Sequence, residues 1–180
     1  MAQVRSFPPI ADARARVLIL GSMPGKASLA AGQYYAHPQN LFWRILGDVT
    51  GADFALPYAR RARALKACAI ALWDVLESCS REGSLDSSID DATSSANDFA
   101  SFYRDHARIA HVFFNGAKAE ACYRRHVLPL LPVELGRIRY ARLPSTSPAN
   151  ASMPRAHKQR AWQQALARTV SERQRSAAIR

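Results

Sequence analysis

The chain has 180 residues, and its 25 Lys and Arg against 14 Asp and Glu give a formal net charge of +11. This length suits one domain over residues 1–180, and 48% hydrophobic residues exclude a chain that is disordered throughout. No apolar run approaches the roughly 20 residues of a membrane-spanning helix.

The N-terminus and the cysteines indicate a cytoplasmic protein. The first 15 residues lack the apolar core of a secretory signal. Cys68, Cys79 and Cys122 contain no CxxC pair, so neither a disulfide framework nor a four-thiolate cluster is expected. We expect a reducing cytoplasmic setting and no metal or redox cofactor.

The charge is unevenly placed along the chain. Residues 155–180 hold seven Lys or Arg and one Glu, whereas residues 82–105 hold six acids and one Arg. A strongly basic balance favours a polyanionic partner, either nucleic acid or an anionic lipid surface. A basic surface that is simply solvated is the alternative.

Short apolar segments alternate with helical patterns. The predicted strands are residues 16–21, 69–75, 109–115 and 137–143. The predicted helices are one that Asn40 caps and Gly51 ends, and residues 57–68, 97–106, 117–131 and 154–171. We expect residues 1–15 to form an irregular lead-in, residues 22–39 and 80–96 to form loops, and residues 172–180 to form a mobile basic tail.

Strands that alternate with helices predict an α/β fold with a parallel sheet covered on both faces. Ligands of such sheets bind beyond the carboxyl ends of the strands. The loops at three of these ends begin GSMPG, FNGAK and LPSTSPAN. GSMPG supplies neither a GxGxxG nor a GxxxxGK[ST] phosphate-binding loop, which argues against a nucleotide-dependent enzyme.

Four motifs occur in a recognisable order. They are GSMPG at residues 21–25, YYAHPQNLFW at 34–43, Asn-Gly at 115–116, and LPSTSPAN at 143–150. Together, from about Val17 to Trp162, they resemble the uracil-DNA glycosylase superfamily. Among its branches the chain looks most like the hypoxanthine-DNA (deoxyinosine) glycosylases, and next most like the mismatch-specific uracil/thymine glycosylases.

The resemblance implies a three-layer α/β/α sandwich with a four-stranded, mostly parallel central sheet. Members of the superfamily flip a damaged nucleotide out of duplex DNA and hydrolyse its N-glycosidic bond. The iron–sulfur branches need four cysteine ligands, and the three cysteines place this chain outside them.

Asn40 is the catalytic residue that the resemblance implies. The mismatch-specific branch positions its water with an Asn before the Pro of GxxPG, where this chain has Met23, and a thioether cannot orient water. The hypoxanthine branch uses the Asn of HPxN, which is Asn40 here. The alternative is that Asn40 serves only as a helix cap.

Four residues are expected at the base. Tyr35 aligns with an aromatic residue that stacks on the flipped base, and Asn115 matches an Asn that hydrogen-bonds the base edge. Ser22 and Met23 would line the same site. The alternatives are that Tyr35 packs on the sheet as a loop aromatic and that Asn115 only closes the turn with Gly116.

The last loop and the helix after it are expected to contact DNA. Leu143 stands where the classical uracil branch has a His aimed at the base, which weakens an ordinary uracil chemistry. Ser145 matches a Ser that contacts the DNA backbone, and residues 146–151 are expected to enter the minor groove. The full set of expected DNA contacts is Ser145, Ser147, Asn150, Arg155 and Lys158.

The resulting hypothesis is a monofunctional DNA glycosylase of base excision repair that acts as a monomer on a damaged base in double-stranded DNA. Hypoxanthine is the favoured base. The alternatives are a uracil or mismatch glycosylase on the same fold, and a non-catalytic DNA-binding relative. Met23 and Leu143, apolar where polar residues are usual, favour the last. Through its DNA, the protein would associate with the nucleoid.

Overall fold

The computed structural model describes residues 2–178, and the side chains of residues 3–133 and 135–169. Its centre is a four-stranded parallel sheet in the order β3-β2-β6-β7. The strands are β2 (Val17–Gly21), β3 (Ile70–Asp74), β6 (His111–Asn115) and β7 (Arg139–Leu143). The four predicted strands are confirmed, and all residues of β2 and β3 are buried, as strands covered on both faces should be.

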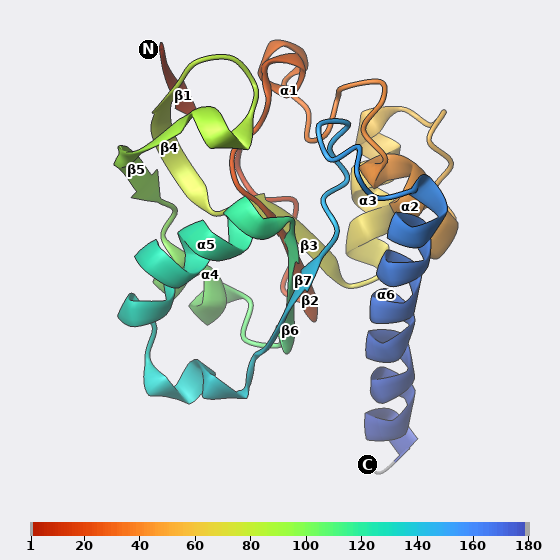
Figure 1. Cartoon of the computed structure of the whole chain (residues 1–180). Helices are drawn as coiled ribbons and strands as arrows, with labels where there is room; N and C mark the ends of the chain where they lie inside the picture. Colours follow the sequence, from red (N-terminus) through yellow and green to blue (C-terminus); the bar gives the residue numbers. More distant parts are fainter. Residues whose placement is uncertain (1, 179–180) are drawn as a thin grey trace.

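Helices cover both faces of this sheet. The helices α2 (Phe42–Thr50), α3 (Tyr58–Ala67) and α6 (Arg155–Ala178) lie on one side, while α4 (Phe99–Asp105) and α5 (Ala117–His126) lie on the other (Figure 1). The expected three-layer α/β/α architecture is confirmed. In α2, apolar residues at helical spacing are buried, with Phe42 against Trp162 of α6 and Trp43 against Tyr58 of α3, and Gly51 ends the helix in the left-handed conformation, with a φ of 71°.

A second, antiparallel sheet differs from the sequence prediction. Its strands are β1 (Ala2–Arg5), β4 (Leu76–Arg81) and β5 (Ile89–Ala96), in the order β1-β4-β5. The expected irregular lead-in and the expected loop over residues 80–96 are therefore wrong over these strands. The sequence of β5, IDDATSSA, carries almost no apolar pattern, so its strand is fixed by backbone pairing with β4.

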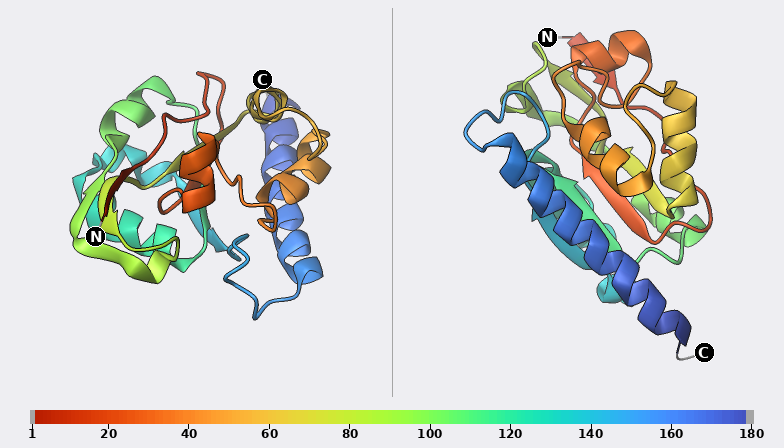
Figure 2. Two further views of the ribbon diagram at one scale, coloured as in Figure 1. Left: turned by 90° about the horizontal axis from the view of Figure 1, so that it is seen from above. Right: turned by 90° about the vertical axis from the view of Figure 1, so that its right-hand side faces the viewer.

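Other elements shift the predicted boundaries. A short helix, α1 (Lys26–Ala31), lies in the expected loop over residues 22–39. The chain leaves α5 at His126 and makes two 3₁₀ turns, η2 (Leu128–Leu130) and η3 (Val133–Arg137); a third, η1 (Asp86–Ser88), precedes β5. The helix α6 continues to Ala178, through most of the expected tail, and it runs along the whole sheet (Figure 2). Residues 179 and 180 lie outside the described residues. Between residues 2 and 178, no helix is long and apolar enough to cross a bilayer.

The segment between β1 and β2 covers the open edge of β3. Ile10 forms an isolated antiparallel bridge with Leu72, with both backbone hydrogen bonds at 2.9 Å. The carbonyl of Phe7 accepts hydrogen bonds from the Trp73 indole at 3.0 Å and the Tyr34 hydroxyl at 3.1 Å. An uncovered edge would expose unpaired backbone groups. This segment also reaches the carboxyl end of β3, where the candidate site lies.

Candidate active site

The carboxyl ends of the parallel strands bring the candidate residues together. In the sheet register Gly21 lies beside Asp74, and Asn115 lies beside Leu143. The loops that follow these ends gather at the top of Figure 1, together with the loop between α1 and α2. The backbone N–H of Leu41 donates to the Thr146 carbonyl at 3.1 Å, which links the loop between α1 and α2 to the loop after β7.

Tyr35 is held in an unusual backbone conformation. Its φ is 53°, in the left-handed region that non-glycine residues seldom adopt. One face of its ring stacks on Phe42, with 4.1 Å between centroids and 23° between planes. The side chain is half-buried, so part of the ring remains accessible to a ligand.

The hydroxyl of Tyr35 is buried and has no hydrogen-bond partner among the described residues. Burial raises the pKa of Tyr35, and the carboxyl of Asp74 raises it further, whereas the nearby Asn115 amide lowers it. The hydroxyl is thus a neutral group with unused hydrogen-bonding capacity, and such groups are uncommon in folded proteins outside functional sites.

Asn40 caps the start of α2 through its side-chain oxygen and keeps its NH₂ group available. Its Oδ1 accepts the backbone N–H of Phe42 at 3.0 Å, so the expected cap role is present at the start of α2. No hydrogen bond engages its Nδ2 group within the part of the chain that the structure describes, and the residue is half-buried. The NH₂ group is therefore free to bind water or substrate.

Asn115 is oriented by Thr146. Its Oδ1 accepts the Thr146 backbone N–H at 2.8 Å, and its Nδ2 donates to the Thr146 hydroxyl at 2.9 Å. These two bonds fix the amide and leave one N–H of Nδ2 without a full hydrogen bond, next to the Tyr35 hydroxyl. Gly116 follows with a φ of 100°, and a Cβ there would lie 3.0 Å from the Ser145 Cβ, so this turn requires glycine.

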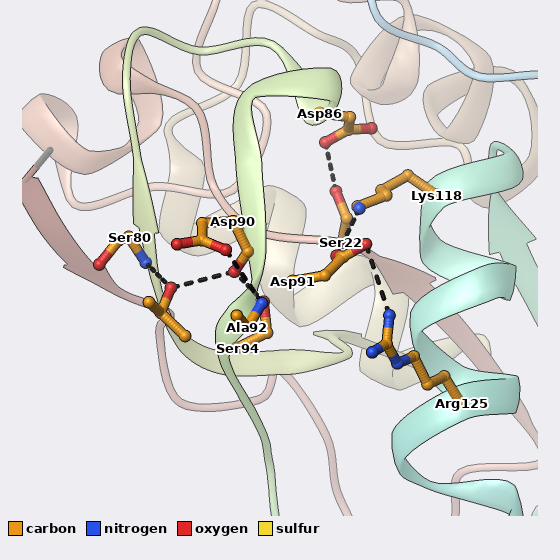
Figure 3. A network of polar contacts seen from close by, with 10 residues as sticks. Ser22, Ser80, Asp86, Asp90, Asp91, Ala92, Ser94, Lys118 and Arg125 are labelled. Carbon is orange, nitrogen blue, oxygen red and sulfur yellow. Dashed lines mark hydrogen bonds and ion pairs between the residues drawn. The ribbon is translucent and has the colours of Figure 1, made fainter.

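Ser22 and Met23 lie in the interior. The Ser22 hydroxyl donates to the Asp86 carboxylate at 2.5 Å, and Met23 is 6% exposed in the hydrophobic core. Figure 3 shows the Ser22–Asp86 contact beside the ion pairs of Asp91 with Lys118 at 2.6 Å and with Arg125 at 3.8 Å. Both side chains already have partners in the fold. Contact of Ser22 or Met23 with a base remains a prediction.

Arg81 supports the GSMPG loop from below. It is buried, and its Nη2 donates to the Pro24 carbonyl. Its Nε and Nη1 have no partner among the described residues. Its charge lowers the pKa of Asp74 and Asp86, although burial, the larger effect, raises both. The guanidinium therefore partly compensates two buried carboxyl groups behind the loop.

The loop after β7 is held by internal bonds. The backbone N–H groups of Ser147 and Ala149 donate to the hydroxyls of Ser145 and Ser147, each at 3.2 Å. Asn150 donates from Nδ2 to the Ser145 carbonyl at 3.2 Å. Trp162 of α6 donates to the Pro144 carbonyl at 2.9 Å, which anchors the loop on the helix.

The two cations predicted to contact DNA differ in position. Arg155 is exposed at the start of α6, where it can reach a phosphate. Lys158 is 3% exposed, and its Nζ donates to the Asn150 carbonyl at 2.5 Å; burial lowers its pKa. The structure thus makes Lys158 a support for the loop, which does not fit the expected phosphate contact.

Asp74 is the site residue that the sequence analysis missed. It ends β3, is 3% exposed, and its Oδ2 accepts the Ser6 hydroxyl at 3.2 Å. Burial raises its pKa to about 7, with a further rise from Asp86, whereas Ser6 and Arg81 oppose the rise. A single acid at the end of an otherwise apolar strand was the available signal. Within the described residues, no group of three or more His, Cys, Asp or Glu side chains could hold a metal.

Comparisons with known proteins define the class. The family model of the uracil DNA glycosylase superfamily matches residues 8–166, so the chain belongs to this superfamily. Two relatives named hypoxanthine DNA glycosylase, from Methanosarcina barkeri and Methanosarcina acetivorans, are 44% and 40% identical over 117 and 116 residues. Each alignment covers 64% of this chain and 72% of the relative.

A solved structure agrees with the family. The solution NMR structure of a candidate uracil DNA glycosylase from Methanosarcina acetivorans matches with a TM-score of 0.76 and 34% sequence identity. The match covers 92% of this chain and 97% of that chain. The expected superfamily and its fold are therefore confirmed.

Proposed function

We propose that this chain is a monofunctional DNA glycosylase that releases hypoxanthine from DNA and leaves an abasic site. The observation that supports the proposal is that the loops carrying Asn40 and Asn115 are joined through Thr146 at one edge of the sheet, where the Tyr35 hydroxyl and the Asn40 NH₂ group have no partner among the described residues. The names of the two relatives that are 44% and 40% identical favour hypoxanthine as the base.

The base would bind between an aromatic ring and a carboxamide. Extruding a nucleotide costs a few kcal/mol of lost stacking, and least for a base that pairs badly. Stacking on the open face of Tyr35 offsets about 1–3 kcal/mol of this cost. The free N–H of Asn115 then donates to the O6 of hypoxanthine, in an orientation that Thr146 fixes in advance.

The bond cleavage needs little acid–base chemistry. Positive charge develops on the sugar and negative charge on the leaving base, and preorganised donors at the base stabilise the latter. Asn40 donates from its NH₂ group to the attacking water and holds it near the sugar, while its Oδ1 remains on the helix start. The water supplies the hydroxyl group of the abasic sugar, and its proton leaves with the base, so no covalent enzyme intermediate forms.

Double-stranded DNA is the proposed partner, bound by a monomer that associates with the nucleoid. Arg155, His157 and Arg160 are exposed on the first turns of α6, directly after the loop proposed to enter the minor groove. Contacts of such cations with phosphates position the enzyme without reading sequence.

The decisive experiment uses duplexes that differ in one base. The wild-type chain is incubated with duplexes that carry deoxyinosine, deoxyuridine, mismatched thymidine or deoxyadenosine, and abasic sites are cleaved with alkali. We expect cleavage of the deoxyinosine strand first. Cleavage of the deoxyuridine strand alone would support a uracil glycosylase, and tight DNA binding without cleavage would support a non-catalytic relative.

A further inference from the structure

Asp74 is a buried carboxyl group that the mechanism above does not use. It lies at the carboxyl end of β3, next to Gly21 of the central strand. Its backbone is fixed as well, because the Asn97 side chain donates to its carbonyl at 2.9 Å. The carboxyl group is therefore held in place at the edge where the base is proposed to bind.

Only one oxygen of this carboxyl group is engaged. Oδ2 contacts the hydroxyl of Ser6 at 3.2 Å, and no hydrogen bond reaches Oδ1 within the described part of the chain. The Ser6 hydroxyl also lies 3.5 Å from the Phe7 carbonyl, which it can donate to when Oδ2 carries a proton. Oδ1 is thus presented as a hydrogen-bond acceptor when Asp74 is ionised, and also when a neutral Asp74 carries its proton on Oδ2.

Oδ1 faces the same space as the hydroxyl of Tyr35. A Cβ built on Gly21 would lie 2.3 Å from Oδ1 and 2.9 Å from the Tyr35 hydroxyl oxygen. Both groups therefore lie close against the backbone of Gly21, where only a glycine leaves room for them. A base stacked on the ring of Tyr35 would have an edge over its hydroxyl end, beside Asp74 and Asn115.

The amide oxygen of Asn115 is less available as a hydrogen-bond acceptor than Oδ1 of Asp74. The Oδ1 of Asn115 already accepts the Thr146 N–H, so the unused capacity of this residue is mainly the second N–H of Nδ2. Asp74 and Asn115 together therefore present an acceptor and a donor at the carboxyl edge, on the two strands that flank β2.

We propose that Asp74 determines specificity by accepting the N1–H of the flipped hypoxanthine at Oδ1, while Asn115 donates to O6. This inference rests on the proposed function. Adenine has an unprotonated N1 and an amino group at position 6. Its N1 would place an acceptor against Oδ1 of Asp74, and its amino group would place a donor against the N–H of Asn115. A site with buried polar groups left unpaired rejects such a base strongly.

The test compares two bases and four proteins, one of which is a control. Full-length wild type, Asp74→Ala and Asp74→Asn are measured against duplexes with hypoxanthine or with unsubstituted purine, which lacks both N1–H and O6. Single-turnover release is measured on ordinary nucleotides, and affinity is measured on 2′-fluorinated nucleotides, which resist cleavage. Asp91→Asn, a carboxylate-to-amide change in the ion pair with Lys118, is the matched control.

We expect Asp74→Ala to lower hypoxanthine release and affinity roughly 10- to 100-fold relative to purine. Asp74→Asn keeps an acceptor oxygen without the charge, so it should lower the preference by a smaller factor, and Asp91→Asn should leave it unchanged. An equal loss on both bases, or no loss, overturns the assignment. The affinity arm gives this answer even if the wild type releases no base, an outcome that would instead reject the proposed function.

Discussion

The burial of Asp74 makes a quantitative prediction about stability. Its pKa is raised to about 7 in the folded protein, from 3.8 as the ordinary value, chiefly because burial disfavours the charge. Between these two values the folded state binds a proton that the unfolded state has lost, so the free energy of unfolding falls as pH rises. One pKa unit corresponds to about 1.4 kcal/mol, so the ionisation of Asp74 lowers the free energy of unfolding by about 3 kcal/mol between pH 5.0 and pH 8.5.

Asp74→Asn removes this titration while keeping the shape of the side chain. Urea unfolding of wild type and variant, followed by tryptophan fluorescence at pH 5.0, 6.0, 7.0 and 8.5, measures the difference in unfolding free energy at each pH. The unfolding free energy of the variant relative to that of the wild type should rise by about 3 kcal/mol from pH 5.0 to pH 8.5, with most of the change below pH 7. Other titrating groups contribute to both proteins and cancel in the difference.

The control separates this effect from the general loss of a carboxylate. The pKa of Asp91 is lowered, first by its hydrogen bond with Lys118, so its contribution is lost only as pH falls through the acidic range. The difference between Asp91→Asn and wild type should therefore be constant from pH 5.0 to pH 8.5. Parallel pH profiles for Asp74→Asn and wild type would refute the raised pKa.

The remaining predictions concern catalysis and DNA binding. Asn40→Ala should slow base release about 100- to 1,000-fold in single-turnover assays, with DNA affinity little changed. Loss of the helix cap should lower the stability of this variant by only about 1 kcal/mol. Near-normal release by the folded variant would contradict the catalytic role. Asn115→Ala should lower the ratio of hypoxanthine to adenine release, and an unchanged ratio contradicts its contact with the base. Arg155→Gln should lower the slope of log Kd against log salt by about one. Lys158→Met should weaken DNA binding without a change in slope, because Lys158 holds the Asn150 carbonyl; a reduced slope would show that Lys158 contacts phosphate.

The central sheet and its functional edge follow from the sequence because they depend on local signals. Residues 17–21 and 70–74 are apolar runs that only a sheet covered on both faces buries, and the loops after parallel strands must meet at one edge. Helix α2 has a polar cap, apolar positions at helical spacing and a terminal glycine. These signals suffice without knowledge of tertiary contacts.

The second sheet and the role of Lys158 depend on partners far along the chain. The strand β5 forms because β4 lies beside it, although its own residues are polar. Lys158 resembles any other cation of the basic C-terminal segment until the loop after β7 is folded against it. Asp74 likewise becomes a candidate only when Gly21 and Tyr35 are placed beside it.

The structure also bears on whether the chain is a glycosylase or a non-catalytic DNA-binding relative. Met23 and Leu143, the apolar residues at usually polar positions, are 6% and 7% exposed and pack in the hydrophobic core. Their side chains fill the interior of the fold, so they do not replace polar groups on an open surface. The Tyr35 hydroxyl, which is buried and unpartnered among the described residues, would leave buried hydrogen-bonding capacity unused in a protein that only bound DNA. The arrangement therefore favours an enzyme whose water-holding and base-binding groups come from other positions than in the mismatch-specific branch.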